Sequence, residues 1–270
     1  MPELPEVETI VRGLRRALGG AKIAAVEVRR EKMAQAPPHL DFTQALVGER
    51  IEGVERRAKY VLIELRSGRR LVTSLRMTGR LVIHAPGDRE FPATYVVITL
   101  GDGRRLAFAD VRTFGRMRLV EANERWDDAL GIEPLGGAFT GERFGAILAG
   151  RRTPIKALLL DQRRVVGIGN IYACESLWLA EIRPSRPAGS LRGPARERLR
   201  AAIVDVLERA IEMRGTSVDD YVDAEGLKGG FQNALAVYGR NGEGCPRCGS
   251  PIRRTVILGR GTWWCGQCQR

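Results

Sequence analysis

Four of the five cysteines stand in two short motifs near the end of the 270-residue chain. Each motif has the form Cys-x-x-Cys, and sixteen residues separate the two. This spacing is typical of a structural zinc site with four thiolate ligands, between which the chain folds back as a hairpin. Two disulfides are the competing interpretation, but nothing marks the chain for an oxidising compartment. We therefore expect one structural Zn²⁺ ion, a hairpin from residues 252–258 and 262–264, and the ligands Cys245, Cys248, Cys265 and Cys268.

The segment around these cysteines, residues 239–270, is strongly basic. It carries six arginines against the single acid Glu243. A small basic hairpin held by a metal suits the grip of phosphate groups, and Arg260, between Gly259 and Gly261, should lie on a tight turn from which it can approach DNA. The alternative is that zinc only stabilises the fold of this end of the chain and that the arginines are solvated. The fifth cysteine, Cys174, follows a helical apolar pattern and is expected to be a buried, inert thiol.

The opening residues Met1-Pro2-Glu3 place a proline and an acid directly ahead of an amphipathic helix. If Met1 is removed, Pro2 becomes a free secondary amine. An α-amino group titrates near pKa ~8 against ~10.4 for lysine, so such an amine is a usable nucleophile at neutral pH. The positive end of the following helix favours its neutral form. The alternative is that Pro2 only precedes a helix.

The charge balance indicates a polyanionic partner. The chain has 44 basic and 32 acidic residues, a formal net charge of +12 and a pI of about 10.1. This suits nucleic acid or an anionic membrane face, although a solvated basic surface is the alternative. No apolar span reaches the length of a bilayer and no signal peptide opens the chain, so we expect a cytoplasmic protein that does not enter membranes.

The hydrophobic pattern changes twice along the chain. Apolar residues recur at helical spacing from Val7 to Leu18, short strand-like runs follow between residues 22 and 120, and helical spacing returns after residue 137. Several short strands in this arrangement predict a β-sandwich. We therefore predict an α+β fold whose parts are an N-terminal helix and β-sandwich (2–122), a linker (123–137), a helical domain (138–238) and a zinc-finger β-hairpin (239–270).

Two further kinds of motif suggest contacts with nucleic acid. Gly167-Ile168-Gly169-Asn170 lies between two helical runs, where exposed amides suit a phosphate, and Lys156 lies upstream. In the sheet half, Met77, Arg112 and Phe114 stand at strand-to-loop junctions. Apolar wedges and an arginine in such positions are what a base-flipping enzyme needs, although Met77 and Phe114 taken singly are more often core residues.

Together these segments resemble the bacterial formamidopyrimidine-DNA glycosylase family of base-excision enzymes. The resemblance runs from Pro2 to Arg270. It rests on five motifs, namely PELPEVET at the start, Ala58-Lys59-Tyr60, Arg112-Thr113-Phe114-Gly115, DQRRVVGIGNIYACE around Asn170, and GRGTWWCGQCQ at the last knuckle. It implies a β-sandwich joined to a helix-two-turn-helix domain and a zinc finger, with duplex DNA in the cleft between them.

The resemblance also implies a mechanism. Pro2 would attack C1′ of a flipped nucleotide and form a Schiff base, and Glu3 would act as general acid and base. β- and δ-elimination would then cut the strand, so that one nucleophile serves both the glycosylase and the lyase reaction. The expected substrates are oxidised purines, 8-oxoguanine and formamidopyrimidines, in double-stranded DNA.

Further roles follow from the same resemblance. Lys59, Asn170 and Arg260 match positions that hold phosphates, with Lys59 and Arg260 counted in the catalytic site. Lys156 matches a position near the damaged nucleotide, and residues 215–228 match a mobile loop over the everted base. The remaining matches are to residues that fill the emptied stack and contact the orphaned cytosine, namely Met77, Arg112 and Phe114.

The sequence departs from the family pattern at two places. Ser74 stands where the family usually has histidine, and Pro92-Ala93-Thr94-Tyr95 replaces a histidine-containing run, which puts DNA affinity and lesion range in question. An endonuclease VIII-like enzyme for oxidised pyrimidines is the alternative, but its opening normally has glycine where Leu4 stands. A lesion-binding protein without catalysis is a third interpretation, against which the intact Pro2 and Glu3 speak. We expect a monomer in the bacterial cytoplasm, associated with the nucleoid.

Overall fold

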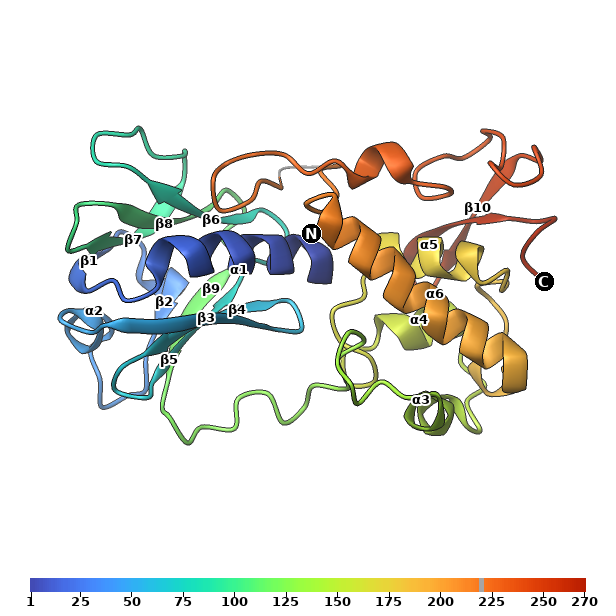
Figure 1. The fold of residues 1–270 in the computed structure, drawn as a ribbon, viewed down its shortest axis with the longest axis horizontal. Helices are drawn as coiled ribbons and strands as arrows, with labels where there is room; N and C mark the ends of the chain where they lie inside the picture. The colour runs from blue at the N-terminus through green and yellow to red at the C-terminus, as the bar shows by residue number, and fades with distance from the viewer. Residues whose placement is uncertain (219–220) are drawn as a thin grey trace. The chain divides into compact units, whose positions relative to one another are not determined.

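The chain forms two compact units in a computed structural model that describes residues 1–218 and 221–270 (Figure 1). The first unit combines Met1–Asp128 with Met213–Gly230, and the second combines Ala129–Glu212 with Phe231–Arg270. Residues 213–230 therefore belong by their contacts to the first unit, whereas the sequence pattern had grouped them with the helical domain. The reason is long-range packing, which a local pattern does not report.

The first unit is a β-sandwich of two sheets (Figure 1). One sheet has four antiparallel strands in the order β1 (Ile23–Val28), β7 (Thr94–Leu100), β8 (Arg105–Asp110) and β6 (Gly79–His84). The other has five strands in the order β2 (Ala34–Gln35), β9 (Arg116–Val120), β5 (Arg70–Ser74), β4 (Tyr60–Leu65) and β3 (Ile51–Arg57). Its pairs are antiparallel except for the short parallel pair of β2 and β9. A one-turn 3₁₀ segment, η1 (Glu31–Met33), and the short helix α2 (Phe42–Leu46) complete this part.

Helix α1 (Leu4–Leu18) packs against β3, β4 and β6 of the sandwich. Its apolar residues recur every three or four positions, and the side chains of Val7, Ile10, Val11, Leu14 and Leu18 are fully buried. They join one core with apolar residues from both sheets. This confirms the helix that the spacing predicts.

Residues of the 213–230 segment pack directly on α1. Tyr221 and Ala224 belong to the same core as α1 and the sheets. A Cβ atom at Gly13 would lie 2.8 Å from the Cβ of Ala224, so glycine is required where the segment crosses the helix. The backbone N–H of Ile83 in β6 also donates to the carbonyl of Ala224, at 2.9 Å. The segment is therefore a built part of the first unit.

The second unit is helical and ends in a hairpin. Its helices are α3 (Gly141–Leu148), α4 (Ile155–Leu160), α5 (Asn170–Leu179) and α6 (Gly193–Glu212), with 3₁₀ segments η2 (Ala188–Ser190) and η3 (Phe231–Ala234). Strands β10 (Ile252–Ile257) and β11 (Arg260–Cys265) form the hairpin and pair in antiparallel register. The predicted α+β class, with its sandwich, helical domain and terminal hairpin, is confirmed. No helix in the described part of the chain is long and apolar enough to cross a membrane.

Candidate active site and zinc centre

The start of α1 holds the predicted nucleophile and its acid. Pro2 is buried, and Glu3, which is 3% exposed, is the N-cap residue. Glu3 and Glu6 form a capping box in which each side chain accepts a hydrogen bond from the backbone N–H of the other, with Glu3 N to Glu6 Oε2 at 2.7 Å. The partial positive charge of the helix start acts on the nitrogen of Pro2 and on the Glu3 carboxylate. The arrangement offers a buried amine position with a carboxylate one residue away.

Glu6 also ties the 213–230 segment to this helix start. Its Oε1 accepts from the backbone N–H of Thr216 at 2.7 Å, so the two oxygens of one buried carboxylate serve two different segments. The hydroxyl of Tyr221 lies 3.3 Å from the Glu6 carbonyl and 3.2 Å from that of Arg214. Burial, and next the nearby Glu6 charge, raise the pKa of Tyr221, which keeps its hydroxyl a neutral donor. Glu6 lies in the first turn of α1, and no sequence pattern indicates its contact with the 213–230 segment.

A second tie within this segment centres on Asp223, which is 2% exposed. One of its oxygens accepts from the guanidinium of Arg214, and the other accepts from the backbone N–H groups of Glu225 and Leu227 at 2.9 and 3.0 Å. Arg214, two residues after the end of α6, adopts a positive φ of 62°. Within the predicted lesion loop, residues 215–228, Asp219 and Asp220 lie outside the described residues.

The three predicted stacking residues gather at the ends of neighbouring loops. Met77 and Phe114 are 42% and 51% exposed, which excludes the alternative that they are core residues. The Arg112 guanidinium lies 4.8 Å from the centre of the Phe114 ring and 3.0 Å from the Met77 sulfur. An exposed apolar pair with an arginine between them suits insertion into a base stack.

Asp110 organises these two loops, although no sequence pattern singled it out. Its carboxylate is fully buried and accepts from the Thr78 hydroxyl in one loop and from the backbone of Arg112 and Gly115 in the other, at 3.2 and 2.7 Å. Lys59 lies elsewhere in the first unit, half-buried in the two-residue turn between β3 and β4, where Ala58 has a positive φ.

Three predicted residues of the second unit meet where α4, α5 and the finger hairpin join. Lys156 is fully buried, and its ammonium donates to Asn170 Oδ1, the Gly261 carbonyl and the Thr262 hydroxyl at 2.6, 2.9 and 2.7 Å. Asn170 begins α5 and itself donates to Gly261 at 3.1 Å. Arg260, next to this junction, is exposed. Lys156 therefore pins the hairpin and Asn170 in place beside the exposed Arg260.

The four predicted zinc ligands are gathered at the base of the hairpin. Their sulfur atoms lie within 4.8 Å of one another, and the pairs Cys245–Cys268 and Cys248–Cys265 are 3.9 and 3.5 Å apart. With Zn–S bonds of about 2.3 Å, a tetrahedron has sulfur–sulfur edges of about 3.8 Å. A disulfide would bring two sulfurs to about 2.05 Å. The donor set and its spacing therefore fit one structural Zn²⁺ ion.

Groups around the thiolates complete this centre. The indole N–H of Trp178 donates to Cys245 Sγ at 3.4 Å, and the backbone N–H of Cys268 donates to Cys265 Sγ at 3.4 Å. Burial disfavours the Cys245 thiolate, but the bonds from Trp178 and from backbone amides outweigh it and lower the pKa of Cys245 to about 6. Cys174 is fully buried in the apolar cluster beside the centre, as predicted.

Glu175 holds the start of the finger segment to α5. Its buried carboxylate accepts from the consecutive backbone N–H groups of Ala236, Val237 and Tyr238, at 2.8 to 3.0 Å. Burial raises the pKa of Glu175, and these three amides act in the opposite direction. No sequence pattern indicates this role of Glu175.

Comparison with known proteins identifies the class of protein to which this fold and these site residues belong. Family models for the N-terminal domain and the H2TH domain of formamidopyrimidine-DNA glycosylase match residues 1–117 and 130–222, and the model "Zinc finger found in FPG and IleRS" matches residues 242–270. The chain is thus a zinc-finger DNA glycosylase of DNA repair.

Relatives of the whole chain make the assignment specific. The formamidopyrimidine-DNA glycosylase of Moorella thermoacetica is 51% identical over 94% of both chains, and that of Desulforamulus reducens is 44% identical over 100% of this chain and 99% of its own. The chain belongs to the formamidopyrimidine-DNA glycosylase family.

Solved structures agree with this assignment. The MutM (Fpg) protein of Thermus thermophilus has a TM-score of 0.89 and 42% identity, covering 99% of this chain and 98% of that one. The Lactococcus lactis Fpg mutant G226P, solved with DNA containing Fapy-dG, has a TM-score of 0.91 and 34% identity over 100% of both chains.

Proposed function

We propose that this glycosylase excises oxidised purines, 8-oxoguanine and formamidopyrimidines, from duplex DNA and then cleaves the strand as an AP lyase. The observation that carries the proposal is the buried pair of Pro2 and Glu3 at the start of α1, held by Glu6. The Lactococcus lactis relative was solved with DNA containing Fapy-dG and with DNA containing an abasic site, the substrates of the two steps.

Removal of Met1 makes Pro2 the nucleophile. Met1 is 44% exposed and the residue behind it is small, so the methionine is accessible to removal. The freed secondary amine uses its lone pair to form a bond to C1′ while the bond from C1′ to the base breaks, and the proton of the amine passes to the departing base. The nitrogen then uses its lone pair to form the iminium as the bond from C1′ to the ring oxygen breaks. A buried amine at the positive end of a helix is kept neutral and reactive.

Glu3 acts as the proton carrier of the reaction. In its acid form it protonates the ring oxygen of the deoxyribose as the sugar opens. As a carboxylate it then takes a proton from the sugar, which the iminium acidifies. The 3′ phosphate leaves in the first elimination and the 5′ phosphate in the second. A carboxylate that is 3% exposed beside a cation is suited to both roles.

The remaining predicted residues bind the substrate. Lys59 and Arg260 hold phosphates near the lesion, and Asn170 does so from the start of α5, pinned by Lys156. Met77, Arg112 and Phe114 fill the space that the flipped nucleotide leaves. We further propose that the enzyme acts as a monomer on the bacterial nucleoid.

Borohydride trapping tests the nucleophile. Protein from which Met1 has been removed should form a covalent complex with damaged duplex when the iminium is reduced. The matched control is the same chain with one residue retained ahead of Pro2, which should bind the duplex but trap none of it. Equal trapping by both proteins would exclude Pro2 as the nucleophile. Binding without trapping by the processed protein would instead support the lesion-binding interpretation.

Oxidised pyrimidines are the second candidate substrate class. A Lactococcus lactis Fpg was solved with DNA containing an oxidised pyrimidine, so the fold accepts more than one lesion type. Excision of 8-oxoguanine opposite cytosine should exceed excision of thymine glycol under single-turnover conditions. A preference for thymine glycol would overturn the proposed substrate and favour the endonuclease VIII-like alternative.

A further inference from the structure

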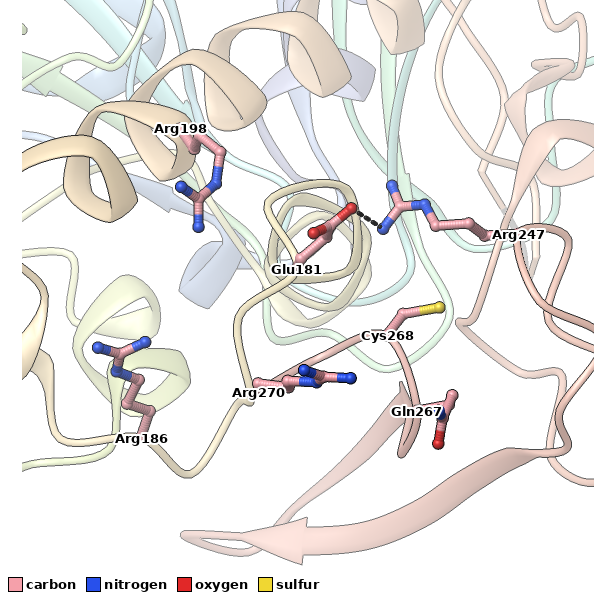
Figure 2. Close-up of a pocket in the computed structure, with 7 residues that line it drawn as sticks. All are labelled: Glu181, Arg186, Arg198, Arg247, Gln267, Cys268 and Arg270. Carbon is pink, nitrogen blue, oxygen red and sulfur yellow. Dashed lines mark ion pairs between the residues drawn. The ribbon is translucent and has the colours of Figure 1, made fainter.

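A pocket rich in arginine lies in the second unit, and its lining shares with the residues discussed above only the zinc ligand Cys268 and two arginines of the basic segment 239–270, Arg247 and Arg270. It has a volume of about 340 Å³ and is lined by Glu181, Arg186, Arg198, Arg247, Gln267, Cys268 and Arg270 (Figure 2). These residues come from the chain after α5, from α6 and from the two zinc knuckles. The lining therefore gathers four guanidinium groups and one acidic side chain.

One of the four arginines already has a structural task. Arg247 pairs with Glu181 at 3.0 Å, stacks over Trp178 at 4.6 Å, and donates to the carbonyls of Trp178 and Leu179 at 3.4 Å. It thus satisfies the last carbonyls of α5 and uses the only acidic side chain of the lining. The positive charge that remains comes from Arg186, Arg198 and Arg270.

These three arginines line the pocket, and Figure 2 shows the side chain of Arg270 extending away from Arg186 and Arg198, on the side of Gln267 and Cys268. In the part of the chain that the structure describes, no carboxylate pairs with the side chain of Arg198 or Arg270, and the side chain of Arg186 donates only to Ser190, with Nε to Oγ at 3.1 Å. Figure 2 shows Arg186 and Arg198 extending toward one another, with the sulfur of Cys268 pointing to the other side. Three like charges around one hollow repel each other unless an anion lies between them.

Hydrogen bonds fix the backbone of Gln269 and Arg270 beside the pocket. Gln269 is 2% exposed, donates to the Ile182 carbonyl at 2.9 Å and accepts from Cys265 N at 2.8 Å. The backbone of Arg270 pairs with Glu181 and Arg183 at 3.2 and 3.1 Å. The guanidinium of Arg270 therefore starts from a rigid position, which lowers the entropic cost of binding a ligand.

The pocket lies at the far end of α5 from the predicted phosphate contacts. Asn170 begins this ten-residue helix, which is about 15 Å long at 1.5 Å per residue, and Glu181 follows its end. Along β11, Arg260 and Cys265 are likewise about 17 Å apart. A phosphate bound near Asn170 or Arg260 does not reach this pocket.

We propose that this pocket is a second anion site of the enzyme, which binds a phosphate group between Arg186, Arg198 and Arg270. The planar guanidinium group of arginine donates paired hydrogen bonds to two oxygens of a phosphate. A cluster of arginines is therefore better suited to a phosphate than to anions in general. The phosphate comes either from a free phosphate compound or from the backbone of a DNA segment outside the lesion contact. The site goes beyond the proposed function, because it needs neither Pro2 nor the lesion.

The test uses full-length, zinc-loaded protein and the double variant R198A/R270A. The matched control is R192A/R209A, which removes the same charge from exposed positions in or beside α6 that do not line the pocket. In the first arm, inorganic phosphate replaces chloride at constant ionic strength. If the pocket binds free phosphate, the melting temperature of the wild type and the control rises, and R198A/R270A loses this rise.

In the second arm, binding of an undamaged duplex is measured against salt concentration in buffer without phosphate. Each phosphate contact contributes about 0.9 to the slope of log K against log salt, so loss of two contacts lowers the slope by about 1.8 relative to the control. A changed slope assigns the site to DNA, and a lost response to inorganic phosphate assigns it to a free phosphate compound. If R198A/R270A matches R192A/R209A in both arms, the proposal is overturned.

A third measurement separates the proposal from a role toward the metal. A zinc ion with four thiolates carries a net charge of −2, and nearby arginines can balance it. The rate at which a chelator removes zinc is therefore compared for the same two variants. Faster zinc loss from R198A/R270A with both binding arms unchanged would show that the arginines only balance the zinc centre, and would exclude a phosphate site.

Discussion

At the scale of single residues, Glu6 is the link between the start of α1 and the 213–230 segment. Its two oxygens accept from Glu3 N and from Thr216 N, both at 2.7 Å. Glutamine keeps the shape but has one acceptor oxygen and one NH₂ group, so one of the two backbone donors would face another donor. Glu6→Gln should lose about 1–3 kcal/mol of stability, measured by urea unfolding, and should slow excision because Glu3 is held less firmly.

The control for this variant is Glu225→Gln. Glu225 is an exposed acid of the same segment whose ion pairs with Arg16 and Arg214 are both 3.3 Å long, and such pairs contribute about 0–1 kcal/mol. Equal stability and excision rate for the two variants would contradict the role given to Glu6.

Comparison of Lys156 with Arg260 distinguishes a residue with a structural role from a residue that contacts a phosphate. Its fully buried ammonium has three acceptors within the protein, so Lys156→Met should destabilise the junction of α4, α5 and the hairpin by about 1–3 kcal/mol. DNA affinity should fall with the salt slope unchanged. Arg260→Ala, in contrast, should lower the slope by about 0.9, because it removes a phosphate contact. A change of that size in the salt slope for Lys156→Met would contradict a purely structural role of Lys156.

At the scale of elements, the spacing of apolar residues was enough to predict a helix or strand that is long and has one buried face. The helical spacing from Val7 to Leu18 corresponds to α1, the strand-like runs between residues 22 and 120 contain the strands of the sandwich, and the helical spacing after residue 137 contains α3 to α6. The short helix α2 and the two-residue strand β2 were missed, because five or fewer residues carry no measurable period. β3 was missed since four of its seven residues are charged and a fifth is glycine, which hides the strand pattern.

The candidate site was predicted unevenly for a related reason. Residues with unusual chemistry, such as Pro2 or the cysteines, stand out in the sequence. Asp110 and Glu6 look like ordinary acids, and their importance lies in backbone groups that they reach in space. Glu6 and Thr216 are 210 positions apart, and no local pattern reports such a contact.

The zinc-finger hairpin, residues 239–270, leads to a prediction about removal of the metal. Zinc holds together a hairpin whose apolar contacts are few, so removal of the metal by a chelator should unfold residues 239–270 and leave the sandwich intact. Duplex binding should weaken strongly, while the melting transition of the first unit stays within a few degrees. Added Zn²⁺ should restore binding. Unchanged DNA affinity in the metal-free protein would count against the finger as a DNA contact.

At the scale of the whole molecule, the chain passes between its two units three times, after Asp128, Glu212 and Gly230. The first unit is therefore incomplete as residues 1–128 alone. It would lack Tyr221 and Ala224 from its core and the Thr216 amide from Glu6. Burial of one large side chain contributes roughly 1.5–3 kcal/mol, which is a substantial part of the stability of a domain of this size.

A fragment of residues 1–128 should consequently melt at a lower temperature than the first unit does in the intact protein. A synthetic peptide of residues 213–230, added in excess, should raise that temperature by binding to α1, because a ligand of the folded state stabilises it by mass action. The control peptide carries Ala224→Asp, whose side chain cannot fit beside Gly13, where the Cβ atom of Ala224 lies 2.8 Å from the position a Cβ would take. It should give no stabilisation. If neither peptide changes the melting temperature, the segment adds little to the first unit, and its close fit to α1 depends on the rest of the chain.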